Sequence, residues 1–152
     1  MTEIMLIRHG ETEWNRTGRF QGHSDIPLTE NGILQAQALS RNLIMDRVDK
    51  IYASDLVRAM ETARPLANRF GLDVEPDPAL RELHFGAWEG RYFRDINAEY
   101  PDIMKRFYRD PENVEIPESE SFTDFQQRVS GRVREIVNKW HGKRIILVSH
   151  GA

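Results

Sequence analysis

The hydrophobic positions of this 152-residue chain follow two different periods in turn. Short apolar runs at residues 3–7, 49–54, 72–76 and 144–149 are typical of buried strands. Between these runs, apolar residues recur every three or four positions, as they do on the inner face of an amphipathic helix. Strands that alternate with helices predict an α/β fold, in which a parallel or mainly parallel sheet is covered on both faces.

Capping residues mark where two of the helices begin. Thr29 is a suitable N-cap for a helix over residues 30–45, and Ser54 for a second helix over residues 55–64. The second helix should end or kink near Pro65, because proline has no backbone N–H to donate. The first helix is predicted to bury an apolar stripe formed by Ile33, Ala36, Leu39, Leu43 and Ile44.

Two stretches interrupt the alternation. Residues 8–27 are polar and contain glycine, which predicts a long loop, and long loops in compact domains are usually functional. Residues 76–120 are irregular and contain only short helical pieces. Ser121 and Asp124 then form a pair that resembles a capping box, and they open the most regular helix of the chain.

Composition narrows the class of protein. The apolar fraction of 39% and the charged fraction of 30% suit one folded domain over residues 1–152. The net charge of −3 does not indicate a nucleic-acid-binding protein, because such domains usually carry a basic excess. The absence of cysteine excludes disulfides and thiolate zinc sites. No stretch suits a signal peptide or a membrane helix, so we expect a cytoplasmic protein with no membrane partner.

The chain stops at Ala152, immediately after the last predicted strand. In an α/β fold a covering helix normally follows such a strand, and parallel sheets are buried on both faces. We therefore expect that the domain over residues 1–152 lacks a C-terminal helix and strand.

Charged and polar side chains collect where the predicted strands end. Arg8 and His9 follow the first strand, and His150 follows the last. Arg58 lies on the first turn of the helix after the second strand, and Glu82 lies in the irregular segment after the third. Because ligands of open α/β sheets bind outside the carboxyl ends of the strands, we expect these side chains to converge at one edge of the sheet.

These residue types suit phosphoryl transfer. Two neighbouring arginines repel each other unless an anion lies between them, and their planar guanidinium groups suit phosphate. Their charges should also disfavour a protonated His9, which leaves a neutral imidazole able to attack phosphorus. Glu82 is then the carboxyl group available to protonate the departing alkoxide. The other histidines, His23, His84 and His141, are interpreted as structural or exposed.

A metal site built from His9, His150 and Glu82 is the rival chemistry, because histidine and carboxylate are common ligands of catalytic zinc. Arg8 argues against this site, since a fixed cation beside a metal ligand weakens metal binding. We therefore expect no metal and no other cofactor.

Four stretches of the chain resemble the successive motifs of the histidine phosphatase superfamily, in its phosphoglycerate mutase-like branch. They are LIRHGETEWN, SDLVRAMETA, LRELHFGAWEG and ILVSHG, and they occur in the family's order along the whole chain. The resemblance implies a three-layer α/β/α sandwich and phosphoryl transfer without a cofactor. It also implies roles for individual residues: His9 becomes phosphorylated, Glu82 acts as general acid and later general base, and the phosphoryl oxygens are held by Arg8, Arg58 and His150.

The resemblance also implies substrate-binding positions at Asn15, Gln21, Gly22 and Gly151. The stretch RELHFGAWEGRYFRDINAEYP resembles broad-specificity and α-ribazole phosphatases more than mutases, so we expect hydrolysis of a small phosphorylated metabolite. A phosphoglycerate mutase that uses the same phosphohistidine is the second hypothesis. The third is a catalytically weak member that binds phosphorylated ligands or protein partners.

One loop departs from the phosphatase pattern. Those enzymes often have a GES turn before the long helix, and this chain has ESES at residues 118–121. Two carboxylates near an anion site would be unfavourable, so we expect Glu118 and Glu120 to face away from the site.

Overall fold

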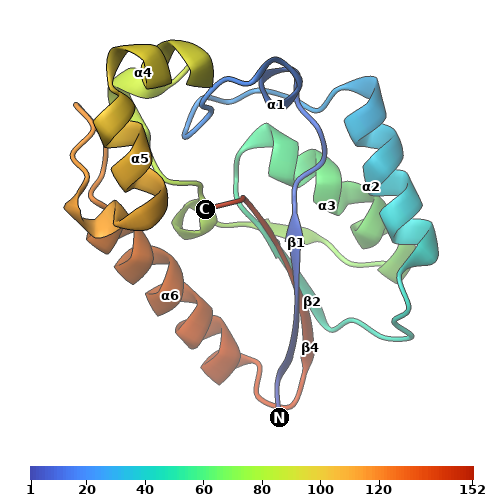
Figure 1. Ribbon diagram of the computed structural model, residues 1–152. Coiled ribbons are helices and arrows are strands. Elements are labelled where there is room, and N and C mark those ends of the chain that lie inside the picture. The colour runs from blue at the N-terminus through green and yellow to red at the C-terminus, as the bar shows by residue number, and fades with distance from the viewer.

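The computed structural model describes all 152 residues and contains a four-stranded sheet in which every strand pair is parallel. The strands lie in the spatial order β1-β4-β2-β3, and their bounds are β1 Glu3–Arg8, β2 Lys50–Ala53, β3 Val74–Pro76 and β4 Arg144–Ser149. The longer helices are α2 (Glu30–Asn42), α3 (Val57–Phe70) and α6 (Phe122–Lys139). Figure 1 shows α2 and α3 on one side of the sheet and α6 on the other, so the predicted three-layer α/β/α sandwich is confirmed.

The two central strands divide their side chains between two cores, because successive residues of a strand point to opposite faces. On the face covered by α3, the buried strand residues are Ile51, Ala53, Ile146 and Val148. On the face covered by α6, they are Tyr52, Ile145 and Leu147, which pack with Ile136 of that helix. Strands buried on both sides explain why these runs are continuously apolar in the sequence.

Helix α2 differs in two ways from its predicted form. It is capped by Thr29 as predicted, but it ends at Asn42 rather than at residue 45. Two members of the predicted stripe face solvent, since Ile33 is 42% exposed and Ile44 is 98% exposed. The buried positions of α2 are instead the small residues Gly32, Ala36 and Ser40. Small side chains allow a helix to approach its neighbour closely, and here the neighbour is α3.

Helix α3 passes through Pro65 and ends only at Phe70, so the predicted end of the helix at the proline was wrong. A proline inside a helix costs about 3 kcal/mol. Leu66 is fully buried in the core, and full burial of a leucine contributes about 2 kcal/mol. Together with the buried Ala63 and Ala67, this packing offsets the local cost of the proline.

A smaller aromatic core lies beyond the carboxyl edge of the sheet. It is formed mainly by the irregular segment, which contains α4 (Phe93–Glu99), α5 (Pro101–Arg109) and the 3₁₀ turns η1 (Pro78–Leu80), η2 (Gly86–Trp88) and η3 (Pro111–Asn113). Its buried members are Phe20, Leu83, Phe85, Trp88, Ile96, Met104, Ile116 and Phe125. In Figure 1, α4 and α5 continue upward from α6, on the side of the molecule opposite to α2. This segment therefore forms one wall above the strand ends.

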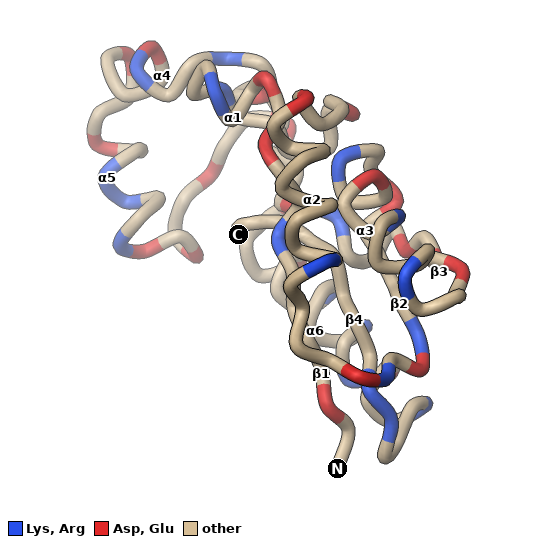
Figure 2. The backbone as a smooth tube through the Cα atoms, turned by 90° about the vertical axis from the view of Figure 1, so that its right-hand side faces the viewer, with Lys and Arg blue, Asp and Glu red and all other residues tan.

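Charged residues of both signs are distributed along the whole backbone, as Figure 2 shows. They are not gathered on one face, which agrees with the small net charge of −3. None of the helices is long and apolar enough to cross a membrane.

Candidate active site

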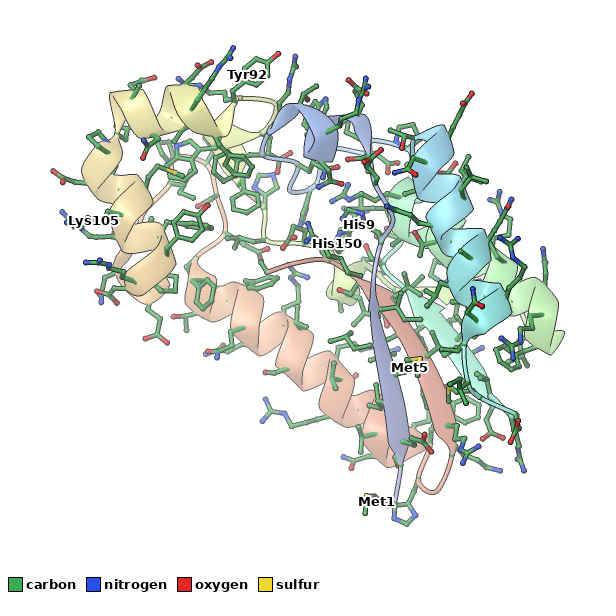
Figure 3. All side chains as sticks on the ribbon, turned by 45° about the vertical axis from the view of Figure 1, so that its right-hand side comes forward. Met1, Met5, His9, Tyr92, Lys105 and His150 are labelled. Atoms are coloured by element: carbon green, nitrogen blue, oxygen red, sulfur yellow. The ribbon has the colours of Figure 1, made fainter.

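His9 and His150 leave the sheet side by side. β1 and β4 are neighbours in parallel register, and Arg8 pairs with Ser149 at their carboxyl ends. The next residue of each strand is a histidine, and the backbone N–H of His9 donates to the carbonyl of Ser149 at 3.0 Å. The two imidazole rings lie 5.2 Å apart between centroids, as Figure 3 illustrates. The predicted convergence of the two strand ends is therefore a direct result of their register.

The imidazole of His9 is held in one orientation. Its Nδ1 lies 2.7 Å from the carbonyl oxygen of Gly10, and because a carbonyl only accepts, Nδ1 carries the proton. The other ring nitrogen, Nε2, is then left with a free lone pair. Burial lowers the pKa of His9 from 6.5 to about 4, the positive charges of Arg58 and Arg8 act in the same direction, and the hydrogen bond to Gly10 opposes them. At neutral pH the ring is uncharged.

Arg58 is fully buried on the first turn of α3. Its two terminal nitrogens donate to the carbonyls of Gly22 and Ser24, each at 2.8 Å, while its Nε has no partner. Gly22 has a φ of +55°, and a Cβ at this position would lie 2.1 Å from a carboxylate oxygen of Glu89. Glycine is therefore required where the loop supports the guanidinium group.

The positive charges at this site are not neutralised by carboxylates. Arg8, Arg19 and Arg58 all line one cavity, and none of them forms an ion pair within 4.0 Å. Both ring nitrogens of His150, the neighbour of His9, are buried without a hydrogen-bond partner. Burial and the charge of Arg58 lower the pKa of His150 to about 2. Unpaired cations and unsatisfied nitrogens around one space favour an anionic ligand that accepts several hydrogen bonds.

Glu82 also lines this cavity. One carboxylate oxygen accepts from the backbone of Leu83 at 2.9 Å, and the other from Gly151 at 3.1 Å and Ala152 at 3.3 Å. Three other glutamates are engaged elsewhere: Glu61 bonds to Leu28, Glu75 pairs with Lys50, and Glu89 bonds to the loop at residues 23–24. No group of three or more histidine, aspartate and glutamate side chains is arranged to hold a metal ion.

The cavity has a volume of about 880 Å³ and is lined by every residue predicted for the site except His150, whose ring lies 5.2 Å from that of His9. The predicted substrate-binding positions that line it are Asn15, Gln21, Gly22 and Gly151. The side-chain oxygens of Asn15 and Gln21 lie 2.9 and 2.8 Å from the hydroxyl of Thr12, which has one proton to donate to either of them. Their amide NH₂ groups remain available as donors. Glu118 and Glu120 do not line the cavity, as predicted.

The outer half of the cavity was not predicted from the sequence. It is lined by aromatic side chains from the irregular segment and its neighbours, namely Phe20, Phe85, Phe93, Phe107, Tyr108 and Phe122. Phe20 lies at the centre of this group, 4.1 Å from the ring of Phe93 and 5.0 Å from the ring of Phe85. The high density of aromatic residues between positions 85 and 108 is the signal that could have indicated this wall.

Comparison with known proteins places this geometry in a family. Residues 4–152 match the model of the histidine phosphatase superfamily (branch 1). The chain is 38% identical over 151 residues to a probable phosphoglycerate mutase GpmB of Yersinia pestis (strain Pestoides F), an alignment that covers 99% of this chain and 70% of that protein. The chain therefore belongs to the histidine phosphatase superfamily.

Two solved structures are similar to this one over nearly its full length. Bacillus stearothermophilus YhfR superposes with a TM-score of 0.92 at 36% identity, covering 99% of this chain and 75% of that chain. The α-ribazole phosphatase from Shigella flexneri superposes with a TM-score of 0.84 at 37% identity, covering 97% of this chain and 73% of that chain. The resemblance inferred from the four motifs is thus confirmed at the level of the family and the fold.

Proposed function

We propose that this chain hydrolyses a small phosphomonoester through a phosphohistidine at His9. The observation that carries this proposal is the uncharged imidazole of His9, whose free Nε2 lies among cations that have no carboxylate partner. A phosphomonoester supplies the missing negative charge and the oxygen acceptors for Arg8, Arg58 and His150. Of the groups in this site, His9 has the free lone pair suited to attack the phosphorus.

The first chemical step transfers the phosphoryl group to the protein. The Nε2 lone pair of His9 forms a bond to phosphorus, and the bond from phosphorus to the ester oxygen breaks. Glu82 gives its proton to the departing oxygen, so that an alcohol leaves rather than an alkoxide. Arg8 and Arg58 stabilise the charge that spreads over the remaining phosphoryl oxygens.

The second step returns the protein to its starting state. The carboxylate of Glu82 takes a proton from a water molecule as the water oxygen attacks phosphorus. The bond from phosphorus to Nε2 of His9 then breaks, inorganic phosphate leaves, and Glu82 is protonated again. The sum of the two steps is ester plus water giving alcohol plus phosphate.

Hydrolysis is favoured over a mutase reaction by the outer half of the cavity. A mutase must bind a second anionic group and exclude water from the phosphohistidine, which requires additional cations and a closed lid. The basic side chains of residues 89–122 do not line the cavity, and Arg19, which does, donates to the hydroxyl of Tyr92 and lies over its ring. Arg91 forms an ion pair with Glu99, and Arg94 lies over the ring of Tyr92. A wall that is mainly aromatic supports an apolar leaving group.

The mutase remains the second candidate, because the similarity to a probable phosphoglycerate mutase GpmB covers 99% of this chain. The third hypothesis, a catalytically weak binding protein, is disfavoured by the complete set of His9, Arg58, Glu82 and His150.

Phosphorus NMR of a reaction with 3-phosphoglycerate and, separately, with p-nitrophenyl phosphate tests the proposal. We expect inorganic phosphate from the aryl ester without any bisphosphoglycerate primer. Rapid formation of 2-phosphoglycerate that depends on primer and releases little phosphate would establish the mutase instead. Absence of both reactions, with tight binding of a phosphorylated ligand, would establish the binding protein.

A further inference from the structure

The half-buried side chain of His23 contacts the backbone of the proposed general acid. Its Nε2 lies 2.9 Å from the carbonyl oxygen of Glu82. Because the carbonyl only accepts, Nε2 of His23 must be the protonated ring nitrogen. Burial lowers the pKa of His23, the bond to Glu82 opposes this, and the neighbouring His84 acts with burial, so the ring is neutral at pH 7.

The loop that carries His23 also holds Arg58. The carbonyls on either side of His23, those of Gly22 and Ser24, are the acceptors of the two terminal nitrogens of Arg58. One short loop therefore contacts a proposed phosphate-binding arginine through its backbone and the proposed acid through a side chain.

The backbone of this loop has an anchor of its own. The carboxylate of Glu89 accepts from the backbone N–H of His23 at 2.9 Å and from both the N–H and the hydroxyl of Ser24, at 3.0 and 2.7 Å. None of these bonds uses the imidazole of His23. Removal of the ring therefore leaves these bonds of the loop in place. It removes the link to Glu82, together with the edge-on contact with His84 and the 3.9 Å approach of Nε2 to Glu120.

The segment that carries Glu82 is held from its other side by α6. Arg128 donates to the carbonyls of Ala79, Arg81 and Glu82 at 3.0, 3.1 and 3.2 Å. Glu120 accepts from Arg128 at 2.5 Å and so keeps the guanidinium group in place. The carbonyl of Glu82 thus accepts two hydrogen bonds, one from α6 and one from the loop that holds Arg58.

We propose that His23 is a positioning residue, which sets the location of the Glu82 carboxyl group relative to the phosphate-binding loop. This inference rests on the proposed phosphatase function. Its consequence is specific: His23 acts on proton donation to the leaving group and not on attack by His9. In a purely structural role, His23 would only pack edge-on against His84, whose ring centroid lies 4.8 Å away. Its replacement would then slow proton donation by Glu82 and attack by His9 alike.

The test compares two esters of similar size that differ in their need for a proton. p-Nitrophenolate leaves with little protonation, whereas the alkoxide of 2-phenylethyl phosphate needs a general acid. We expect His23→Ala to lower kcat/KM for the alkyl ester at least about tenfold more than for the aryl ester, because small displacements of a catalytic group have large effects on rate. The burst of phosphoenzyme formed with p-nitrophenyl phosphate should be nearly unchanged.

Two further variants control for folding. His23→Gln keeps an N–H donor of similar reach, so its ratio of alkyl to aryl rates should return toward that of the wild type. His141→Ala removes an exposed histidine at the far end of α6 and should change neither ester. An unchanged ratio in His23→Ala, or equal slowing of both esters in His23→Ala and His23→Gln, would overturn the positioning role while leaving the phosphatase intact. Failure of the wild-type chain to hydrolyse either ester would overturn the proposed function itself.

Discussion

Gly10 and Thr62 are joined by a hydrogen bond of 2.9 Å, donated by the backbone N–H of Gly10 to the hydroxyl of Thr62. The Thr62 hydroxyl donates in turn to the carbonyl of Arg58, one turn earlier in α3, at 2.7 Å. The carbonyl of Gly10 accepts from Nδ1 of His9. Through this series of bonds, the turn of α3 that presents Arg58 also orients the imidazole of His9. Thr62 was not singled out from the sequence, although its spacing of four residues from Arg58 puts both on one helix face.

Substitution of Thr62 tests that connection. Thr62→Val keeps the size and branching of this buried side chain but leaves the N–H of Gly10 without a partner. We expect the free energy of unfolding to fall by about 1–3 kcal/mol, the usual cost of an unsatisfied buried group. We also expect phosphorylation of His9 to slow about tenfold, because the ring is less well oriented. Urea unfolding and the rate of the phosphoenzyme burst measure the two effects.

Thr123→Val is the matched control, since Thr123 is exposed near the start of α6 and its hydroxyl forms no hydrogen bond within the protein. It should behave as the wild type in both measurements. A Thr62→Val protein indistinguishable from this control would show that the bond to Gly10 has no influence on His9.

Replacement of the proposed nucleophile, His9, tests the mechanism most directly. His9→Ala should lose the acid-labile phosphoenzyme and essentially all turnover, because His9 is the histidine that lines the cavity together with the two unpaired arginines. Acid-quenched labelling with a radioactive phosphomonoester measures the phosphoenzyme directly. Full activity of His9→Ala would rule out the phosphohistidine mechanism.

The proposed role of Glu82 as general acid predicts that the effect of its replacement depends on the leaving group. Glu82→Gln keeps the shape of the side chain but cannot transfer a proton. It should slow alkyl phosphates by about 10²–10⁴, the usual contribution of general acid catalysis, and slow p-nitrophenyl phosphate far less. Steady-state rates over a series of esters with graded leaving groups provide the measurement. Equal slowing of all esters in the series would mean that another group protonates the departing oxygen.

The buried histidines predict how stability depends on pH. The pKa of His9 is lowered from 6.5 to about 4 in the folded protein, and the pKa of His150 is lowered to about 2. Between pH 6.5 and pH 4 the unfolded chain therefore binds protons at these positions that the folded chain does not. The contribution of these neutral histidines to the free energy of unfolding is fully present above pH 6.5 and is lost as the pH falls. At pH 5 the loss is about 2 kcal/mol for each histidine.

Urea unfolding at pH 8 and pH 5 checks this prediction. The decrease in the free energy of unfolding should be smaller by about 2 kcal/mol in His150→Asn, which has no group that titrates in this range. An equal decrease in His150→Asn and in the wild type would mean that His150 is protonated in the folded protein.

The elements of the sandwich were largely determined by the local sequence. The apolar runs of β2 and β4 identify strands buried on both faces, and Thr29 and Ser121 cap their helices as predicted. Ser54 does not cap its helix as predicted, because α3 begins at Val57 and its N-cap is Leu56, with no side-chain capping bond. The errors at the end of α2 and at Pro65 have one origin. In both cases the contacts of a helix with the rest of the core decided where it ends, and local propensity carries no information about those contacts.

The sequence by itself also determined the centre of the site, because parallel strands bring their carboxyl ends to one edge and His9 and His150 each follow a strand directly. Only the tertiary structure decided what surrounds that centre. Gly10 and Thr62 are 52 positions apart, and Arg128 and Glu82 are 46 positions apart. The aromatic wall and the link from His23 to Glu82 come from loops and irregular segments. In such segments no period determines where a side chain points, so its direction is set by long-range packing and hydrogen bonds that form only when the whole chain has folded.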